Sequence, residues 1–375
     1  INVFPNDIKI YYSVENCPRK RAVKTAKSLL PFAVVAIDKE DLMIRSFNNN
    51  TIAAAGVVLA LGTIGTASAE VATVKLAQQF GLLYVPLHIV LEHGLIQKHA
   101  KAMGIKPPNV KLFKISGGAN INKALLADTI DFGAHGVGPM LKLWGKSKGR
   151  FKGALTIADM PLKLNSNDPN VKTVEDYLKV KDHKIATPAA KVSIQAVTLQ
   201  IFTAKKWNDP NKLDHLVVSM KHPIALAALL SGGQTVKSHF ATLPYSYQEL
   251  KSGKVHNVIT SYDIMGGQHS VLTMSVATKF QKENPKTYDA VIAAYLEAFK
   301  FVKENPEKAA DVFIKFTKSK MNRADVVALL RDKSEIEFSE IPKHTMKYGN
   351  FLAKIGDIPQ PKSWKDYYMS NNHKY

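Results

Sequence analysis

One stretch of sequence decides the fold: VKLFKISGGANINKALLADTIDFGAHGVGP, residues 110–139. Its first part, Val110–Ile115, and its later part, Ile130–Ala134, are apolar runs that predict strands, and Asn120–Ala127 between them has helical spacing. The small residues Ser116-Gly117-Gly118-Ala119 predict a tight strand-to-helix turn. Units that alternate in this way build α/β proteins with mostly parallel sheets flanked by helices.

The same alternation extends in both directions, from Val71 to Thr278, and beyond it the pattern predicts an almost entirely helical C-terminal region. Part of the first stretch is echoed later in the chain: residues 124–139 and residues 228–244 share an Ala-Leu-Leu, an apolar run and a proline. A true repeat predicts two similar lobes with facing strand-end loops, where α/β folds bind small ligands. Chance similarity between generic α/β units is the alternative.

Composition excludes several classes of protein. With 46% hydrophobic and 22% charged residues, the 375-residue chain can bury a large core and is neither a disordered tail nor a polytopic membrane protein. A single cysteine, Cys17, allows no internal disulfide and no thiolate metal cage. The formal charge of +20 raises the possibility of nucleic-acid binding. Its lysines are scattered and few residues are arginine, so we expect a solvated surface and no nucleic-acid partner.

The stretch before Glu70 has the layout of a signal peptide. Ile52–Ile64 is apolar, Met43-Ile44-Arg45 precedes it, and small residues follow at Ala67 and Ala69. A helix of this length reaches about 20 Å, short of the roughly 30 Å hydrocarbon core, which disfavours a membrane anchor. We therefore expect a signal peptide over residues 43–69, cleavage after Ala69 and a periplasmic protein.

Residues 1–42 precede this signal, although a secretion signal acts at a free N-terminus. The hypothesis is that translation starts at Met43 and that residues 1–42 are an upstream extension missing from the mature protein. A genuine basic pro-segment is the alternative.

Catalytic motifs are missing from the sequence. It has no Gly-x-Ser-x-Gly, phosphate-loop, Cys-x-x-Cys or His-Glu-x-x-His motif, and the spacing of His88, His93 and His99 does not place them on one helix face. We predict no catalytic residue, no metal and no cofactor. The small-residue turns Ser116–Ala119 and Thr187–Ala190 can instead offer backbone amides to an anion, unless they are ordinary helix caps. The chain is predicted to be a binding protein and not an enzyme.

The sequence resembles the periplasmic substrate-binding proteins of nitrate/sulfonate/taurine-type ABC importers, whose relatives include proteins that handle thiamine-pyrimidine precursors. The resemblance rests on Val71–Gln79, Gly94-Leu95, the run from Ser116 to Gly133, Phe240…Pro244 and Lys279–Ala310.

This resemblance implies a two-lobed periplasmic-binding-protein fold of type II, an ABC permease as partner and a monomer. It implies that lobe 1 comprises residues 70–160 and 268–375, and that lobe 2 comprises residues 161–267. Two hinge crossings, near Asp159–Leu164 and Asp263–Val271, would let the lobes close on a ligand.

Carried over residue by residue, the resemblance also implies ligand-facing positions. They are Gln79, Phe80, Tyr84, Ser116, Gly117, Gly118, His135, Gly136, Thr187, Ala190, Ser193, Thr242 and Leu243. The expected ligand is a small organic anion, sulfonate- or taurine-like. Two departures leave its identity open: Thr187–Ser193 lacks the Gly-Ser step common in sulfonate binders, and no Arg lies in these turns. An enzyme or binder of thiamine-pyrimidine precursors on the same fold is the alternative, although the mature chain lacks the cysteine-rich motif of those enzymes.

Overall fold

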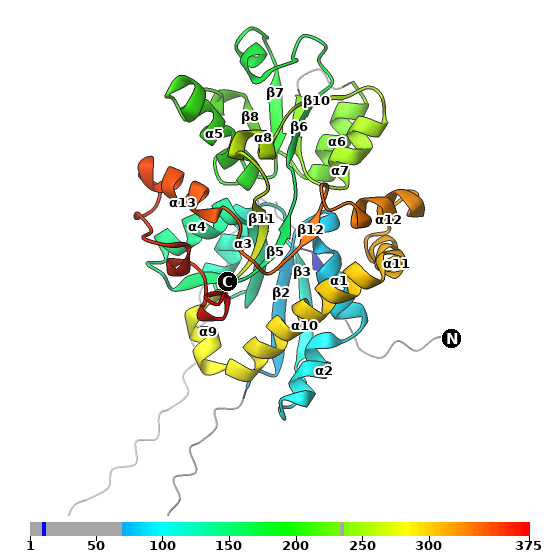
Figure 1. The fold of residues 1–375 in the computed structure, drawn as a ribbon, viewed down its shortest axis with the longest axis vertical. Coiled ribbons are helices and arrows are strands. Elements are labelled where there is room, and N and C mark those ends of the chain that lie inside the picture. The colour runs from blue at the N-terminus through cyan, green and yellow to red at the C-terminus, as the bar shows by residue number, and fades with distance from the viewer. Residues whose placement is uncertain (1–9, 13–69, 233–235) are drawn as a thin grey trace, which may run out of the picture. The chain divides into compact units, whose positions relative to one another are not determined.

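The computed structural model describes residues 10–12, 70–232 and 236–375. The predicted signal peptide, residues 43–69, lies outside the described residues. The predicted upstream extension, residues 1–42, also lies outside them, apart from Ile10–Tyr12. Within the described part, no helix combines the length and apolarity needed to cross a bilayer. The strands form two sheets, each flanked by helices, which define two lobes (Figure 1).

Sheet A belongs to lobe 1 and has seven strands. In spatial order they are β1 (Ile10–Tyr12), β3 (Asn109–Lys114), β2 (Thr73–Gln78), β4 (Phe132–Gly136), β11 (Ser270–Ala277), β5 (Phe151–Asp159) and β12 (Glu337–Phe338). The pairs β1–β3, β3–β2 and β2–β4 are parallel. Strand β11 is antiparallel to both β4 and β5, and β12 is antiparallel to β5.

Sheet B belongs to lobe 2 and has five strands. In spatial order they are β10 (His256–Thr260), β6 (Lys163–Ser166), β9 (Val236–Ala241), β7 (Lys184–Thr187) and β8 (Val217–Ser219). The pairs β7–β8 and β7–β9 are parallel, and β6 is antiparallel to both β9 and β10. Both sheets are thus mixed, because β11 in sheet A and β6 in sheet B run antiparallel to their neighbours.

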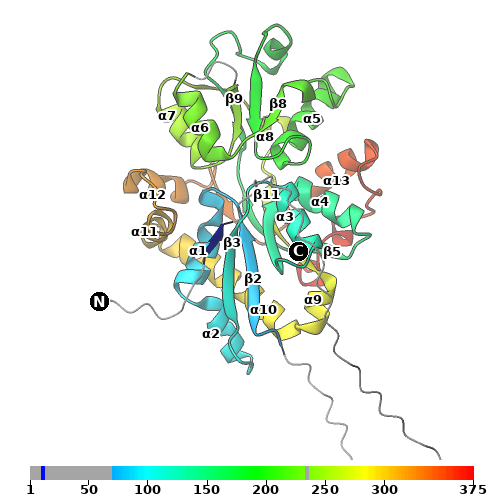
Figure 2. The same ribbon diagram turned by 180° about the vertical axis from the view of Figure 1, so that it is seen from behind.

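The two sheets have equivalent topology. The order β3-β2-β4-β11 in sheet A corresponds to β8-β7-β9-β6 in sheet B. Helix α3 (Gly118–Leu126) leads into β4, and α6 (His222–Leu230) leads into β9. The two units of the predicted repeat therefore occupy equivalent places in the two lobes (Figure 2).

The chain passes from sheet A to sheet B after Asp159 and returns before Ser270. On the return, α8 (Ser261–Met265) is followed by Gly266 and Gly267, whose φ angles are 71° and 124°. Glycine adopts this left-handed region without the penalty that a side chain would add. The glycine pair thus turns the chain back toward lobe 1.

Thirteen helices are found in the described residues. The first seven include α1 (Val85–Glu92), α2 (Leu95–Ala102), α4 (Val137–Lys146), α5 (Ile194–Trp207) and α7 (Tyr245–Lys251). The later ones are α9 (Thr278–Glu283), α10 (Pro285–Glu304), α11 (Pro306–Thr317), α12 (Arg323–Arg331) and α13 (Thr345–Lys354). Helix α10 packs on α1 and α2 through a buried stripe that includes Tyr288, Val291, Tyr295 and Val302, at helical spacing (Figure 1).

Two segments differ from the sequence-based expectation. The polar composition of residues 165–170 predicts a connection, but β6 includes Asn165 and Ser166, both 0% exposed. Their side chains bond to Glu249 and to the Lys237 carbonyl, so polar pairing replaces the apolar pattern that usually marks a strand. The sequence pattern predicts a helix from Ile341 to Ile355, whereas α13 begins at Thr345.

Candidate functional site

A cavity lies where the two lobes meet. Lobe 1 contributes the turn after β2 with Gln79 and Phe80, the 3-10 turn Leu82–Tyr84, and Gly118 at the start of α3. Lobe 2 contributes residues at the starts of two helices: Ser193, Ile194 and Gln195 at α5, and His222 at α6. The remaining lining residues are Leu83, Gly136, Pro139, Pro188, Thr242, Val271 and Leu272. Loops and helix starts from both lobes thus converge on one space.

The cavity is small, and the two lobes contact each other beside it. Its volume is about 40 Å³, which leaves room for about three water-sized groups. The lobes touch around it: the Leu82 amide donates to the Leu243 carbonyl across the lobes at 2.9 Å. A Cβ added at Gly117 would lie 3.0 Å from the Pro188 carbonyl oxygen. The structure therefore describes the closed arrangement of the lobes.

The polar groups of the lining are uncharged. Amide, hydroxyl and imidazole groups come from Gln79, Tyr84, Ser193, Gln195, His222 and Thr242, and the lining includes neither Lys nor Arg. Burial raises the pKa of Tyr84 above its usual range, so the phenol stays neutral. Burial also lowers the pKa of His222 well below its usual range. The site can donate and accept hydrogen bonds without a permanent cation.

A lysine contacts one aromatic ring of the cavity lining. Lys114, at the end of β3, places its Nζ 5.0 Å from the centre of the Phe80 ring. Partial burial lowers the pKa of Lys114. This is a cation–π contact with the ring of Phe80.

Comparison with known proteins places this architecture in a family. Residues 67–315 match the NMT1-like family. The chain belongs to this NMT1-like family. No curated protein matches the sequence.

Solved structures share the fold of this NMT1-like chain. The nitrate-binding protein NrtA from Synechocystis PCC 6803 has a TM-score of 0.65 and 15% identity, over 81% of this chain and 88% of that chain. The alkanesulfonate-binding protein SsuA from Xanthomonas axonopodis has a TM-score of 0.61 and 14% identity, over 78% and 96%. The sulphonate-binding SsuA of Escherichia coli has a TM-score of 0.57 and 15% identity, over 80% and 92%. The periplasmic-binding-protein fold expected from the sequence is confirmed, and these neighbours are transport-associated binding proteins.

Part of the predicted ligand-facing set lies on the cavity wall of the NMT1-like chain. These residues are Gln79, Phe80, Tyr84, Gly118, Gly136, Ser193 and Thr242. The others, Ser116, Gly117, His135, Thr187, Ala190 and Leu243, do not line it.

Several of the predicted residues that do not line the cavity make hydrogen bonds in the turns around it. The Gly117 amide donates to Gln79 Oε1 at 2.9 Å, and the Ser116 carbonyl accepts from Asn120 at 3.0 Å. The Leu243 carbonyl makes the contact between lobes described above, and the Ala190 amide donates to Ser219 Oγ at 2.9 Å. These groups position the turns that frame the cavity.

Two others point into the protein interior. His135 and Thr187 are both 0% exposed, and Nε2 of His135 is 2.7 Å from Ser275 Oγ on the neighbouring strand β11. Burial lowers the pKa of His135 to about 3. In the closed arrangement neither side chain faces the cavity.

Two polar wall residues were not anticipated: Gln195 and His222. Gln195 is the second residue of α5 and His222 the first residue of α6, and each follows a strand-to-helix turn. The signal in the sequence is a polar residue in the first turn of a helix that follows a strand of sheet B. His222 stands directly before Pro223 there.

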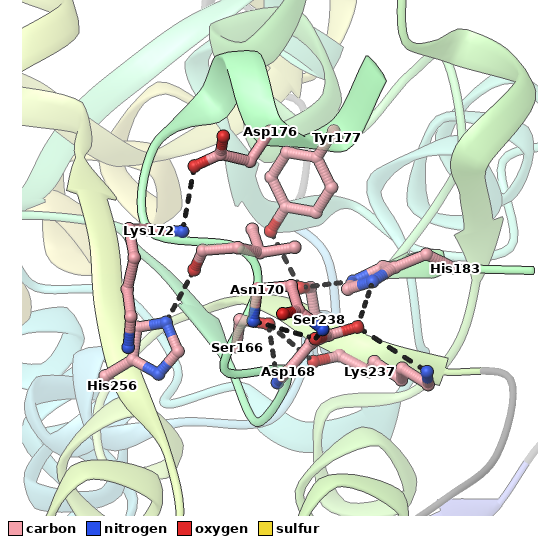
Figure 3. Close-up of polar contacts among 11 residues, drawn as sticks. Ser166, Asp168, Asn170, Lys172, Asp176, Tyr177, His183, Lys237, Ser238 and His256 are labelled. Atoms are coloured by element: carbon pink, nitrogen blue, oxygen red, sulfur yellow. Dashed lines mark hydrogen bonds and ion pairs between the residues drawn. The ribbon is translucent and has the colours of Figure 1, made fainter. Parts of the chain in front are cut away.

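A second polar cluster lies within lobe 2 (Figure 3). His183 places Nδ1 3.4 Å from Asp168 Oδ2 and Nε2 2.8 Å from Ser238 Oγ, in the order found in serine hydrolases (Figure 3). Ser238 is 0% exposed, and its Oγ also accepts from Tyr177 at 2.7 Å. The neighbouring hollow of about 710 Å³ is lined by Asp168 but not by His183 or Ser238. The cluster is therefore a buried hydrogen-bond network inside lobe 2, and its His183 and Ser238 lie apart from this hollow.

Proposed function

We propose that this chain is the exported, periplasmic solute-binding component of an ABC importer. It captures a small organic anion, sulfonate- or taurine-like, between its lobes and delivers it to the membrane permease. It acts as a monomer, without nucleic acid and without catalysis. The leader is removed after Ala69.

One observation carries the proposal: donors from both lobes converge on a cavity that closes where the lobes meet. A ligand held this way stabilises the closed form, and a permease can recognise that form. The start of α5 faces the cavity with Ser193 as its N-cap, which suits an oxyanion. The named neighbours, which include nitrate and sulfonate binders, agree with this class of ligand.

A second candidate is a binder of thiamine-pyrimidine precursors. It is favoured by the aromatic wall of Phe80 and Tyr84 and by the amides of Gln79 and Gln195, which suit a flat, uncharged heterocycle.

A thermal-shift screen separates the two candidates. The purified protein is tested against taurine, alkyl and aryl sulfonates, nitrate, carboxylates and pyrimidine precursors of thiamine. Ligand at 100 times its Kd adds about 2.7 kcal/mol to the free energy of unfolding and raises the midpoint. We expect a sulfonate or a related anion to give the largest shift. A shift with the pyrimidines alone supports the second candidate, and no shift with any compound contradicts both.

A further inference from the structure

A chain of three buried side chains leads from the cavity into lobe 2. Nδ1 of His222 on the cavity wall is 2.7 Å from Nε2 of His239 on β9. Nδ1 of His239 is 2.5 Å from Oε1 of Glu249 on α7. His239 and Glu249 are both 0% exposed. Hydrogen bonds therefore connect the ligand site to a carboxylate that water does not reach.

A positive charge placed beside the buried Glu249 carboxylate is strongly stabilised, because a buried charge without a partner is costly. The second oxygen of this carboxylate accepts from Asn165 Nδ2 at 2.8 Å, and Asn165 is neutral. In the described part of the chain, His239 is the basic residue that contacts Glu249. The 2.5 Å separation between His239 Nδ1 and Glu249 Oε1 is short and fits a charge-assisted hydrogen bond from an imidazole N–H to a carboxylate.

The geometry allows two arrangements of protons. Since a carboxylate only accepts, Nδ1 of His239 carries a proton in both. In the first, His239 is neutral, its Nε2 accepts from Nδ1 of His222, and Nε2 of His222 is an acceptor 3.4 Å from the Gln195 amide nitrogen. In the second, His239 is protonated on both nitrogens and donates to Nδ1 of His222. Nε2 of His222 then carries a proton and is a donor toward the cavity.

We propose that an oxyanion binding in the cavity takes up one proton from solvent and converts the first arrangement into the second. An N–H bond forms at Nε2 of His222, while the proton on its Nδ1 moves to Nε2 of His239. The positive charge settles on His239, between Glu249 and the ligand. This proton supplies the charge that a cavity without Lys or Arg otherwise lacks. His222 binds the ligand, and His239 and Glu249 are positioning residues.

This inference rests on the proposed function and defines its ligand: an anion with an oxygen that accepts from His222. An ammonium or amidinium head would meet a donor and a buried positive charge, and would be rejected.

The groups packed around these three residues are neutral or have charged partners elsewhere. Tyr245 of α7 stacks on His222 at 5.4 Å, and burial raises the pKa of Tyr245, so it stays neutral, as Tyr84 does. Burial and the neighbouring His239 lower the pKa of His222, which keeps it neutral in both arrangements. The other charged groups of these elements have contacts elsewhere. They are Lys163 with Glu335, Lys237 with Asp168, Lys251 with Asp325, Lys184 with the His215 carbonyl, and His256 with the Val171 carbonyl; Lys221 is exposed.

Calorimetry on the full chain tests the proposal. The anion with the largest thermal shift is titrated at one pH in buffers that differ in ionisation enthalpy. The slope of binding heat against that enthalpy gives the number of protons taken up, and we expect about one. A slope of zero overturns the inference and leaves the anion-binding function intact. If no anion binds, the proposed function fails as well.

Two variants locate the proton. Glu249→Gln keeps the shape of the side chain but removes the charge that holds the proton on His239. We expect its proton uptake to fall to near zero and its affinity to fall by about tenfold or more. The matched control, Glu283→Gln on the exposed face of α9, should keep both. If Glu249→Gln does not fold, His222→Gln must lose the uptake. A folded variant of either kind that still takes up one proton contradicts the proposal.

Discussion

His135 shows how one buried side chain links pH to stability. The imidazole is 0% exposed and its pKa falls from 6.5 to about 3 because burial disfavours the charged form. Below pH 6.5 the unfolded chain binds a proton at this residue that the folded protein does not. The stability it contributes is therefore complete above pH 6.5 and is lost as the pH falls toward 3. When the pH is lowered from 6.5 to 5, the free energy of unfolding should fall by about 1.5 kcal/mol less in a His135→Gln variant than in the wild type.

Denaturant titrations at each pH measure this difference in slope. The matched control is His215→Gln, because His215 is exposed and should leave the acid slope unchanged. If both variants lose stability with the wild-type slope, proton binding at His135 does not explain the acid sensitivity.

Helix α5 begins at the cavity, and its cap serves two purposes. Ser193 Oγ accepts from the Ala196 amide at 3.2 Å, and Ser193 also lines the cavity. Ser193→Ala should cost about 1 kcal/mol of unfolding free energy, as loss of an N-cap usually does, and should weaken binding of the anion. The measurements are chemical denaturation and calorimetry.

The matched control for this cap is Ser363→Ala. Ser363 caps a 3-10 turn, Trp364–Asp366, by accepting from the Lys365 amide at 3.3 Å, and it does not line the cavity. This control should lose stability without losing affinity. Equal affinities for the two variants would exclude Ser193 from the binding site.

Helices and strands could be predicted from the sequence where the apolar residues of one buried face recur at regular spacing. Apolar residues at helical spacing predict a helix from Pro285 to Asn305, and α10 spans Pro285–Glu304. Strand β6 was missed because Asn165 is buried through a bond to Glu249, which lies far along the chain. Such a pairing leaves no local pattern.

The same limit applies to the cavity. The family resemblance implies that Gln79 and Ser193 face the ligand, and both line the wall. His222 belongs to the wall only because α6 of lobe 2 packs beside β9 and α7, and its partners His239 and Glu249 are distant in sequence. Composition could show that the turns lack Arg. It could not show which group would replace that charge.

At the scale of the whole molecule, closure depends on how nearly the lobes approach. Gly136 of β4 faces Ile194 of α5 across the cavity, and an added Cβ would lie 2.8 Å from the Ile194 Cβ. The φ of Gly136 is −67°, which alanine adopts freely, so Gly136→Ala adds a clash between lobes and no backbone strain. The clash is relieved when the lobes move apart. We expect a larger radius of gyration in X-ray scattering with ligand present, and affinity lower by roughly tenfold.

A second glycine on the same strand separates closure from folding. A Cβ at Gly133 would lie 2.5 Å from Ile121 Cγ2 of α3, inside lobe 1, where no hinge can relieve it. Gly133→Ala should therefore lose about 1–3 kcal/mol of unfolding free energy and still close on ligand with the wild-type radius. Gly136→Ala should show the reverse, with a small loss of stability and impaired closure. If Gly136→Ala closes as the wild type does, the β4–α5 contact does not limit the approach of the lobes, and closure must be set by the crossings between the two sheets.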